Sequence, residues 1–300
     1  MPTSSEPHFS PAREALRRFR GNGLAMLGYW GLLAVGAFAL LGKFLTEWWI
    51  VFDPARVRLE HKLLPPLSMR GEFFLLGTDE LGRSLFARLL QGASVSLGIG
   101  LVAMAISISV GILMGGIAGY YGQRKLAYIA IDSWVMRLTD VALCFPSFFL
   151  ILTVIALLPS SIFHVMVVIG LTHWMGTARL VRAEFLALRE LDFVTSARAL
   201  GFSDRRIIFR HILPNALAPV FVTANIDVAR AILTESALSF LGFGVDPPHA
   251  TWGNILADGR AYILDAPWLF LIPGLAILGI VLAFNLVGEG LREAFHTKAR

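Results

Sequence analysis

The stretch RAEFLALRELDFVTSARALGFSDRRIIFRHILPNALAP, residues 182–219, is the longest basic, amphipathic segment in an otherwise apolar chain. Within it, Phe193, Ala197 and Leu200 recur at the spacing that gathers side chains on one face of a helix. Gly201 then interrupts the pattern, and glycine readily takes the positive φ that ends a helix. The stretch therefore predicts two short helices joined by a tight bend, lying on a membrane surface with a polar face free for a partner.

The second of these short helices is expected to begin just after the bend and to end before Pro214. Ser203 and Asp204 can cap its N-terminus, where the helix dipole favours an acid. Its basic side chains are Arg205, Arg206, Arg210 and His211. A short basic element of this kind, between apolar spans, is suited to act as a docking lever.

The composition places the chain among integral membrane proteins. Of its 300 residues, 56% are hydrophobic and 16% are charged, and the mean hydropathy is +0.68. The single cysteine, Cys144, lies inside an apolar run, which favours a buried thiol over a disulfide or a metal cluster.

Six apolar runs are expected to cross the membrane as helices, since about 20 residues span the hydrocarbon and only a helix or a closed barrel satisfies the backbone there. They cover residues 24–45, 94–118, 138–158, 162–178, 216–243 and 268–287. Proline is expected to kink two of them, at Pro146 and Pro273. Glycines four residues apart, in the second run and just after it, are expected to allow close helix packing; they are Gly111, Gly115 and Gly119. The fold class is thus all-α and polytopic.

Basic residues set the expected orientation. They gather in the N-terminal segment, in the 123–125 link, in the 179–211 loop and in the 292–300 tail. Under the positive-inside rule, both termini and the organising stretch are cytoplasmic. The expected division is a cytoplasmic segment 1–23, a first span 24–45, an extracytoplasmic loop 46–91, a five-helix core 92–290 containing a cytoplasmic docking loop 182–214, and a cytoplasmic tail 291–300.

Within the long loop, residues 77–83 read GTDELGR. This pattern predicts a turn whose aspartate, Asp79, can cap the helix that follows.

Charged residues inside the fifth run have two open interpretations. Asp227 and Arg230 are three residues apart, so they share a helix face and could pair, and Glu235 follows on the same run. They form either a structural network between helices or part of a pathway or gate, since charges cannot face lipid cheaply. The same alternatives apply to Asp132, Arg137 and Asp140.

The chain lacks the motifs of an enzyme active site. It has no GxxxxGK[ST] phosphate loop, no HExxH, no Cys/His cluster and no GxSxG elbow, and His211 is expected to be a surface or docking residue. We therefore expect no catalytic residue, cofactor or metal in this chain. A permease powered by a separate ATPase is favoured; the alternative is an ion-coupled transporter or channel. A DNA-reading helix-turn-helix is disfavoured because spans on either side leave no free domain, so no nucleic-acid partner is expected.

Several motifs carry a resemblance to a known family. Thr195-Ser196-Ala197, then Gly201, then the HILPN run at residues 211–215, resembles the Glu-Ala-Ala loop of ABC importer permeases in the dipeptide, oligopeptide and nickel branch. Thr195 stands where that family has an acid, and Ser196 where it has its first alanine. Further similar motifs are GTDELGR at 77–83, LSFLGFG at 238–244, Trp252-Gly253 and Phe284-Asn285-Leu286 with Gly288.

The resemblance implies the second permease of a type I ABC importer in a prokaryotic plasma membrane. It implies partners: a homologous permease, two identical or different ATPase subunits that bind ATP and Mg, and an extracytoplasmic binding protein. It also implies that the ATPases are contacted by Phe193, Thr195, Ser196, Ala197, Leu200, Gly201 and Arg205. Cargo in this branch is most often peptide, with nickel, glutathione and sugars also represented.

Overall fold

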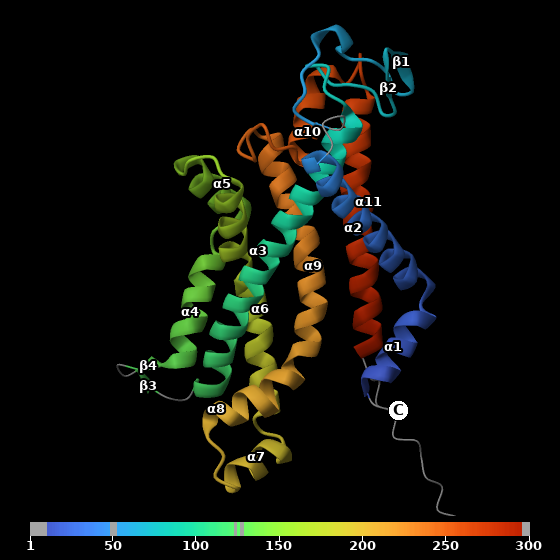
Figure 1. Ribbon diagram of the computed structural model, residues 1–300. Helices are drawn as coiled ribbons and strands as arrows, with labels where there is room; N and C mark the ends of the chain where they lie inside the picture. Colours follow the sequence, from blue (N-terminus) through green and yellow to red (C-terminus); the bar gives the residue numbers. More distant parts are fainter. Residues whose placement is uncertain (1–10, 49–52, 123–124, 127–128, 296–300) are drawn as a thin grey trace, which may run out of the picture.

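The structure, a computed structural model, describes residues 11–48, 53–122, 125–126 and 129–295. Long helices run alongside one another, and short elements lie at both ends of the molecule (Figure 1). Strand structure in the described part is confined to two antiparallel hairpins, β1 (Ser68–Arg70) with β2 (Glu72–Phe74) and β3 (Lys125–Leu126) with β4 (Ile129–Ala130). The predicted all-α, polytopic fold class is confirmed.

The helices follow in chain order. They are α1 (Pro11–Gly21), α2 (Gly23–Trp48), α3 (Leu85–Tyr121), α4 (Ile131–Leu143), α5 (Ser147–Leu157), α6 (Ile162–Leu188), α7 (Asp192–Ala199), α8 (Asp204–Ile207), α9 (Leu213–Phe240), α10 (Trp252–Gly259) and α11 (Trp268–Phe295). Two 3-10 turns, η2 (Leu59–His61) and η4 (Arg260–Tyr262), and a π turn, η3 (Ile208–Ile212), complete the regular structure that is described.

The described helices supply four or five of the six expected spans. By length and composition, four described helices can cross a membrane: α2, α3, α11 and the continuous helix Asp204–Phe240 that contains α9. The bent pair α4 and α5 makes a fifth if it counts as one span. The fourth expected span, α6, has spanning length at 27 residues, but His164, His173 and Arg179 make it less apolar.

The third expected span is broken at its proline. Helix α4 ends at Leu143, α5 restarts at Ser147 with Pro146 at its N-cap, and the two axes differ by 81°. The expected kink is confirmed, while the expectation of one helix over residues 138–158 is wrong. Proline has a fixed φ and no N–H to continue the hydrogen-bond ladder, so it suits the start of a new helix.

Close packing of α3 on α6 depends on the three spaced glycines. A Cβ at Gly115 would lie 2.4 Å from the carbonyl oxygen of Ala178, and one at Gly119 would lie 2.5 Å from the Cβ of Phe185. At Gly111 the nearest atom would be the Cβ of Thr177, at 2.6 Å. The predicted packing role is confirmed, because any larger residue would push the two helices apart.

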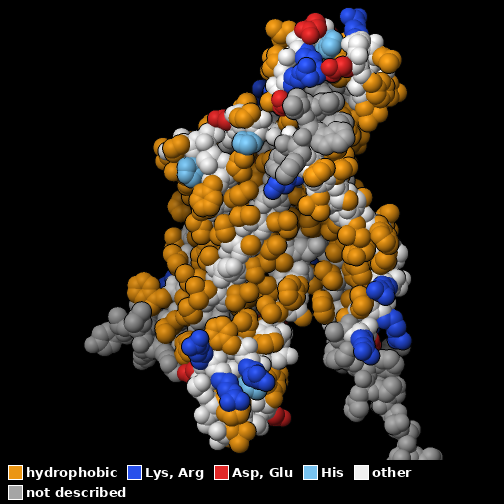
Figure 2. Space-filling view, viewed as in Figure 1, with side chains coloured by type: hydrophobic (Ala, Val, Ile, Leu, Met, Phe, Trp, Pro, Cys, Tyr) orange, Lys and Arg blue, Asp and Glu red, His pale blue; other side chains and the backbone are white. Residues whose placement is uncertain are grey.

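The two ends of the molecule differ in content. Helix α1 and the C-terminal end of α11 lie at the same end as α7, whereas β1, β2 and α10 lie at the opposite end (Figure 1). The space-filling view shows orange hydrophobic surface over the middle and charged side chains mainly toward the ends (Figure 2). Parts of the basic pattern that set the expected orientation, in residues 1–10, 123–124 and 296–300, lie outside the described residues.

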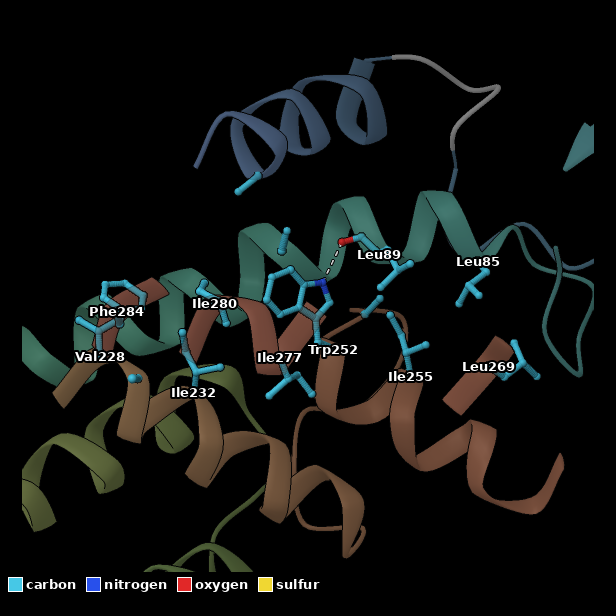
Figure 3. Close-up of a cluster of buried hydrophobic side chains, with 14 of the residues drawn as sticks. Leu85, Leu89, Val228, Ile232, Trp252, Ile255, Leu269, Ile277, Ile280 and Phe284 are labelled. Atoms are coloured by element: carbon cyan, nitrogen blue, oxygen red, sulfur yellow. Dashed lines mark hydrogen bonds between the residues drawn. The ribbon is translucent and has the colours of Figure 1, made fainter. Parts of the chain in front are cut away.

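Residues 53–84 and α10 together form one end of the molecule, which we call the cap. Trp252 anchors it: its indole N–H donates to the carbonyl of Leu89 at 3.1 Å, and its ring lies among side chains of α3, α9 and α11 (Figure 3). Thr251 and Asn254 start α10 with a reciprocal capping box. The cap is thus fixed to the top of the helix bundle by apolar packing and by hydrogen bonds.

Charge pairing inside the cap is centred on Asp79. This carboxylate accepts from the backbone N–H groups of Leu81 and Arg83, both at 2.9 Å, and from Arg88 Nη1 at 2.8 Å. Arg88 also donates to Asp258 of α10 at 2.9 Å. The predicted turn is therefore present, but the expected capping role is wrong, because Ser84 caps α3 by accepting from the N–H of Ala87. Asp79 instead joins the turn to α3.

Candidate docking element and intramembrane charges

The bend at Gly201 has the predicted geometry. Gly201 has a φ of +76°, and the N–H of Phe202 donates to the carbonyl of Ala197 at 3.1 Å, a bond typical of helices that end on glycine. A Cβ at Gly201 would meet nothing within 4 Å. The requirement for glycine here is therefore purely a backbone requirement, since L side chains disfavour this φ.

The second short helix differs from expectation. Helix α8 has only four residues and continues through the π turn η3 directly into α9, so the expected end before Pro214 is wrong. Pro214 lies in the first turn of α9, and the i→i+5 bonding of a π turn removes the need for the N–H that proline lacks. Ser203 occupies the N-cap position without a side-chain capping bond, while Asp204 accepts from the Tyr120 hydroxyl of α3 at 2.7 Å.

We call α7, the Gly201 turn, α8 and η3 the α7–α8 element. Its inner face is apolar and buried against α3, α6 and α9. That face comprises Val194, Ala197, Ile207 and Ile212, which pack in one cluster with Tyr120, Val181, Phe185, Ala216 and Val220. The element is therefore a packed extension of the bundle that ties α6 to α9.

Burial of Ala197 corrects one expectation. Ala197 is only 4% exposed, so it does not share an open docking face with Phe193 and Leu200. The three side chains fall within one arc of the helix, but the neighbouring Val194 turns the Ala197 edge of that arc inward. Periodicity alone locates an apolar arc and does not say which edge the protein buries.

The outer face of the element remains open. Phe193 and Leu200 are exposed, Leu200 to 72%, and the polar Thr195 and Ser196 lie beside them. Arg205 is exposed as well. Basic and hydrophobic side chains stand side by side at this end of the molecule (Figure 2). Of the expected contact residues, the exposed ones thus form a mixed apolar and polar surface.

The predicted pairing of Asp227 with Arg230 is confirmed. Arg230 Nη1 lies 3.5 Å from Asp227 Oδ1, and the two side chains differ sharply in exposure, at 67% for Arg230 and 7% for Asp227. Two residues of α6 that sequence reasoning missed adjoin this pair: His173 lies within electrostatic reach of Arg230, and Thr177 lies beside Asp227. Their spacing of four residues, which puts both on one face of α6, was the available signal.

Glu235 lies in a different environment from Arg230. It is completely buried, and its Oε1 accepts from the hydroxyl of Ser239 at 2.7 Å. The α9 backbone is packed so tightly on α10 here that a Cβ at Gly253 would lie 2.7 Å from the Cα of Ser236. Glu235 therefore faces the contact with the cap, and of the three expected pathway residues only Arg230 is open.

The other intramembrane acids join helices. Asp132 of α4 pairs with Arg182 of α6, and Asp140 of α4 pairs with Arg179 of α6. This arrangement favours the structural interpretation for these two acids. Cys144 is exposed, so the expectation of a buried thiol is wrong. No group of three potential metal ligands occurs among the described residues.

A bundle of helices that are long and apolar enough to cross a membrane defines an integral membrane protein, and comparison with known proteins gives its family. Residues 108–300 match the family described as the inner membrane component of binding-protein-dependent transport systems, and the chain belongs to that family. Residues 10–66 match the N-terminal transmembrane domain of oligopeptide transport permease C, which identifies the dipeptide and oligopeptide branch.

Relatives cover almost the whole chain. A dipeptide transport system permease protein of Alkalihalophilus pseudofirmus is 37% identical over 97% of this chain and 91% of its own length. A putative peptide transport system permease protein of Brucella abortus is 40% identical over 97% and 93%. An oligopeptide transport system permease protein of Bacillus subtilis is 33% identical over 99% and 92%.

A solved structure shares the fold. The inward-facing MetNI methionine ABC transporter superposes on this chain with a TM-score of 0.52 at 18% identity, over 69% of this chain and 96% of that one. At this identity the likeness concerns the fold alone. The family match and the names of the relatives give no support to an ion-coupled transporter.

Proposed function

We propose that this chain forms half of the translocation pore of an ATP-driven importer and couples it to cytoplasmic ATPase subunits through the α7–α8 element. The observation that carries the proposal is the continuity of α8, η3 and α9 as one helix from Asp204 to Phe240. A force applied to α8 would act directly on a membrane span, because a continuous helix moves as a rigid body.

The anchoring of the element supports this role. Val194 and Ala197 hold α7 to the bundle, while α6 enters the element after Leu188 through a short turn. Displacement of the exposed face would therefore be passed to both α6 and α9. The proposed ATPase contacts are the exposed Phe193, Thr195, Ser196, Leu200 and Arg205, with Gly201 setting the bend and Ala197 supporting the face from within.

The family implies the rest of the assembly. A second permease of the same fold would complete the pore, a binding protein would deliver the solute to the cap, and two ATPase subunits, identical or different, would bind ATP and Mg. Both termini and the α7–α8 element would then be cytoplasmic, in a prokaryotic plasma membrane. Since the relatives quoted above are named as peptide, dipeptide or oligopeptide permeases, we propose a peptide as the solute.

A matched pair of substitutions tests the coupling surface. Leu200→Asp places a charge on the open face of the element and should reduce co-purified ATPase about tenfold or more, because charges are excluded from a packed helix groove. Leu264→Asp makes the same change at a side chain that is 92% exposed beside α10, at the opposite end, and should leave the complex intact. Full ATPase binding and peptide uptake by Leu200→Asp would contradict the proposal.

Ala197→Arg tests whether Ala197 contacts the ATPase directly or supports the contact surface from inside the α7–α8 element. Because Ala197 is buried, this change should lower the thermal stability of the isolated chain as well as ATPase binding, whereas Leu200→Asp should lower ATPase binding alone. Equal melting temperatures for the two variants would show that Ala197 faces outward.

A further inference from the structure

Arg230 of α9 lies at a depth in the membrane where an exposed charge is costly. Arg230 lies ten residues before the end of α9 at Phe240, which is about 15 Å along a helix. His173, its neighbour on α6, lies eleven residues after the start of α6 at Ile162, about 17 Å along that helix. Both helices therefore place this position near the centre of a hydrocarbon layer about 30 Å thick.

A guanidinium at that depth cannot face lipid. Charged side chains in the middle of a span face protein or a water-filled cavity, because hydrocarbon cannot solvate them. Yet the Arg230 side chain is 67% exposed in this chain. The face of the bundle that carries Arg230 must therefore border an aqueous path or another chain.

Asp227 satisfies only a small part of the hydrogen-bonding capacity of the Arg230 guanidinium. The single contact recorded between them in the described structure is long, at 3.5 Å, and Arg has five N–H donors. Asp227 is itself buried, beside Thr177 of α6. Such a carboxylate can hold the arginine in place and leave its forked end directed away from the bundle.

The surface of α6 near His173 is open. Gly176, three residues after His173 on α6, is exposed, and a Cβ added there would meet nothing within 4 Å. The α6 surface one turn beyond His173 therefore carries no side chain that would obstruct a solute. The forked donors of arginine match the geometry of a carboxylate, with which they form bidentate hydrogen bonds.

We propose that Arg230 binds the carboxylate of the transported solute at the midpoint of the translocation path, with Asp227 as its positioning residue. The proposal rests on the proposed function, because the path exists only in the importer. For a peptide, the carboxylate is the C-terminus or an acidic side chain. A weakly held arginine suits passage, since binding must be strong enough for entry and weak enough for release.

Charge rescue in the full complex tests the proposal. Both permeases, the ATPases and the binding protein are reconstituted in vesicles, with Cys144→Ser as background because Cys144 is exposed. Arg230→Cys should lower initial uptake of a free-acid peptide about tenfold, the usual effect of losing a charged hydrogen bond. A methanethiosulfonate carrying a quaternary ammonium should restore much of that uptake, and one carrying a sulfonate should not.

Control variants separate the charge at position 230 from general effects of substitution. Arg292→Gln removes the same charge from an exposed pair with Glu289 near the C-terminal end of α11 and should keep uptake within about twofold of wild type. Leu275→Cys on the apolar surface of α11 should react with neither reagent, because charged reagents do not enter lipid. Arg230→Lys should retain more uptake than Arg230→Gln, since it keeps the charge without the fork.

Three results would overturn the inference: normal uptake by Arg230→Gln, no reaction of the Arg230→Cys thiol with either reagent, or loss of the second permease from purified Arg230→Gln complex. The last would mean that Arg230 pairs with an acid of that permease. A wild-type complex that takes up no peptide with ATP would instead contradict the proposed function. In that case, the reagents would still decide whether position 230 faces water.

Discussion

The cap and the α7–α8 element are both small structures at the ends of the same helices, yet they are stabilised in opposite ways. Paired charges tie the cap to α3, with Asp79 bound to Arg83 and to Arg88 of α3, and Arg88 bound in turn to Asp258. The α7–α8 element buries an apolar inner face and leaves Phe193 and Leu200 exposed. Apolar surface does not distinguish the two ends, since Met69 of the cap and Leu200 of the α7–α8 element are both largely exposed. The difference lies in what holds each structure to the bundle: paired charges for the cap and a buried apolar face for the element.

The largest effect is expected from breaking the charge pairing of the cap. Asp79→Ala would leave Arg88, itself buried, without its nearest acid and would remove the acceptor of two backbone N–H groups. Removing one member of a buried ion pair costs about 3–5 kcal/mol. We expect the free energy of unfolding to fall by that amount, as measured by denaturant unfolding in detergent.

A surface pair in the same cap is the control for Asp79→Ala. Glu72, whose side chain is 47% exposed, pairs with Arg58, and Glu72→Ala should cost less than about 1 kcal/mol. Equal losses for the two variants would show that the Asp79 network is no stronger than an ordinary surface pair, and the contrast between the two ends would disappear.

A smaller effect is expected from the bend of the α7–α8 element. Gly201→Val should cost about 1–2 kcal/mol, because an L residue is strained at a φ of +76°. Since nothing lies near a Cβ at this position, Gly201→Asn should cost less, as asparagine tolerates the left-handed region. The measurements are thermal stability, the amount of chain inserted into the membrane, and peptide taken up per ATP hydrolysed. Gly201→Val should lower uptake per ATP more than it lowers membrane insertion. Normal uptake per ATP would show that the bend is not needed for coupling.

The sequence predicted those features that follow from local chemistry. The positive φ of Gly201, the packing of Gly111, Gly115 and Gly119, and the pairing of Asp227 with Arg230 were each determined by residue type and spacing. Such features need no knowledge of distant parts of the chain. Resemblance of the short motifs to a family then led to the correct permease family, confirmed by the match over residues 108–300.

Features set by distant partners were missed. Whether Ala197 faces in or out depends on Tyr120 and Phe185, which belong to other helices. Likewise, the role of Asp79 depends on Arg88 and on Asp258, 170 residues further along the chain from Arg88. Periodicity carries no information about such contacts, so the buried edge of α7 and the charge pairing of the cap became visible only in the fold.

The smallest predicted effect is a pH dependence within the cap, at Glu80. Burial, with the nearby Asp79 as a second cause, raises the pKa of Glu80 above its usual value. An acid whose pKa is higher in the folded state binds its proton more tightly there, so the folded state is penalised as pH rises through that pKa, and the penalty is absent below the unfolded pKa. Glu80→Gln does not ionise and loses only the contact with Arg83 at 3.1 Å. Its melting temperature should therefore rise relative to wild type as the pH is raised from about 4 to about 7.

Glu72→Gln, which removes the same charge from an exposed position, measures the general charge effect. A constant difference between Glu80→Gln and wild type over this range would show that Arg83 fully compensates for burial. Glu80 would then join Asp79 as an acid whose charge the cap compensates fully, which would sharpen its contrast with the α7–α8 element.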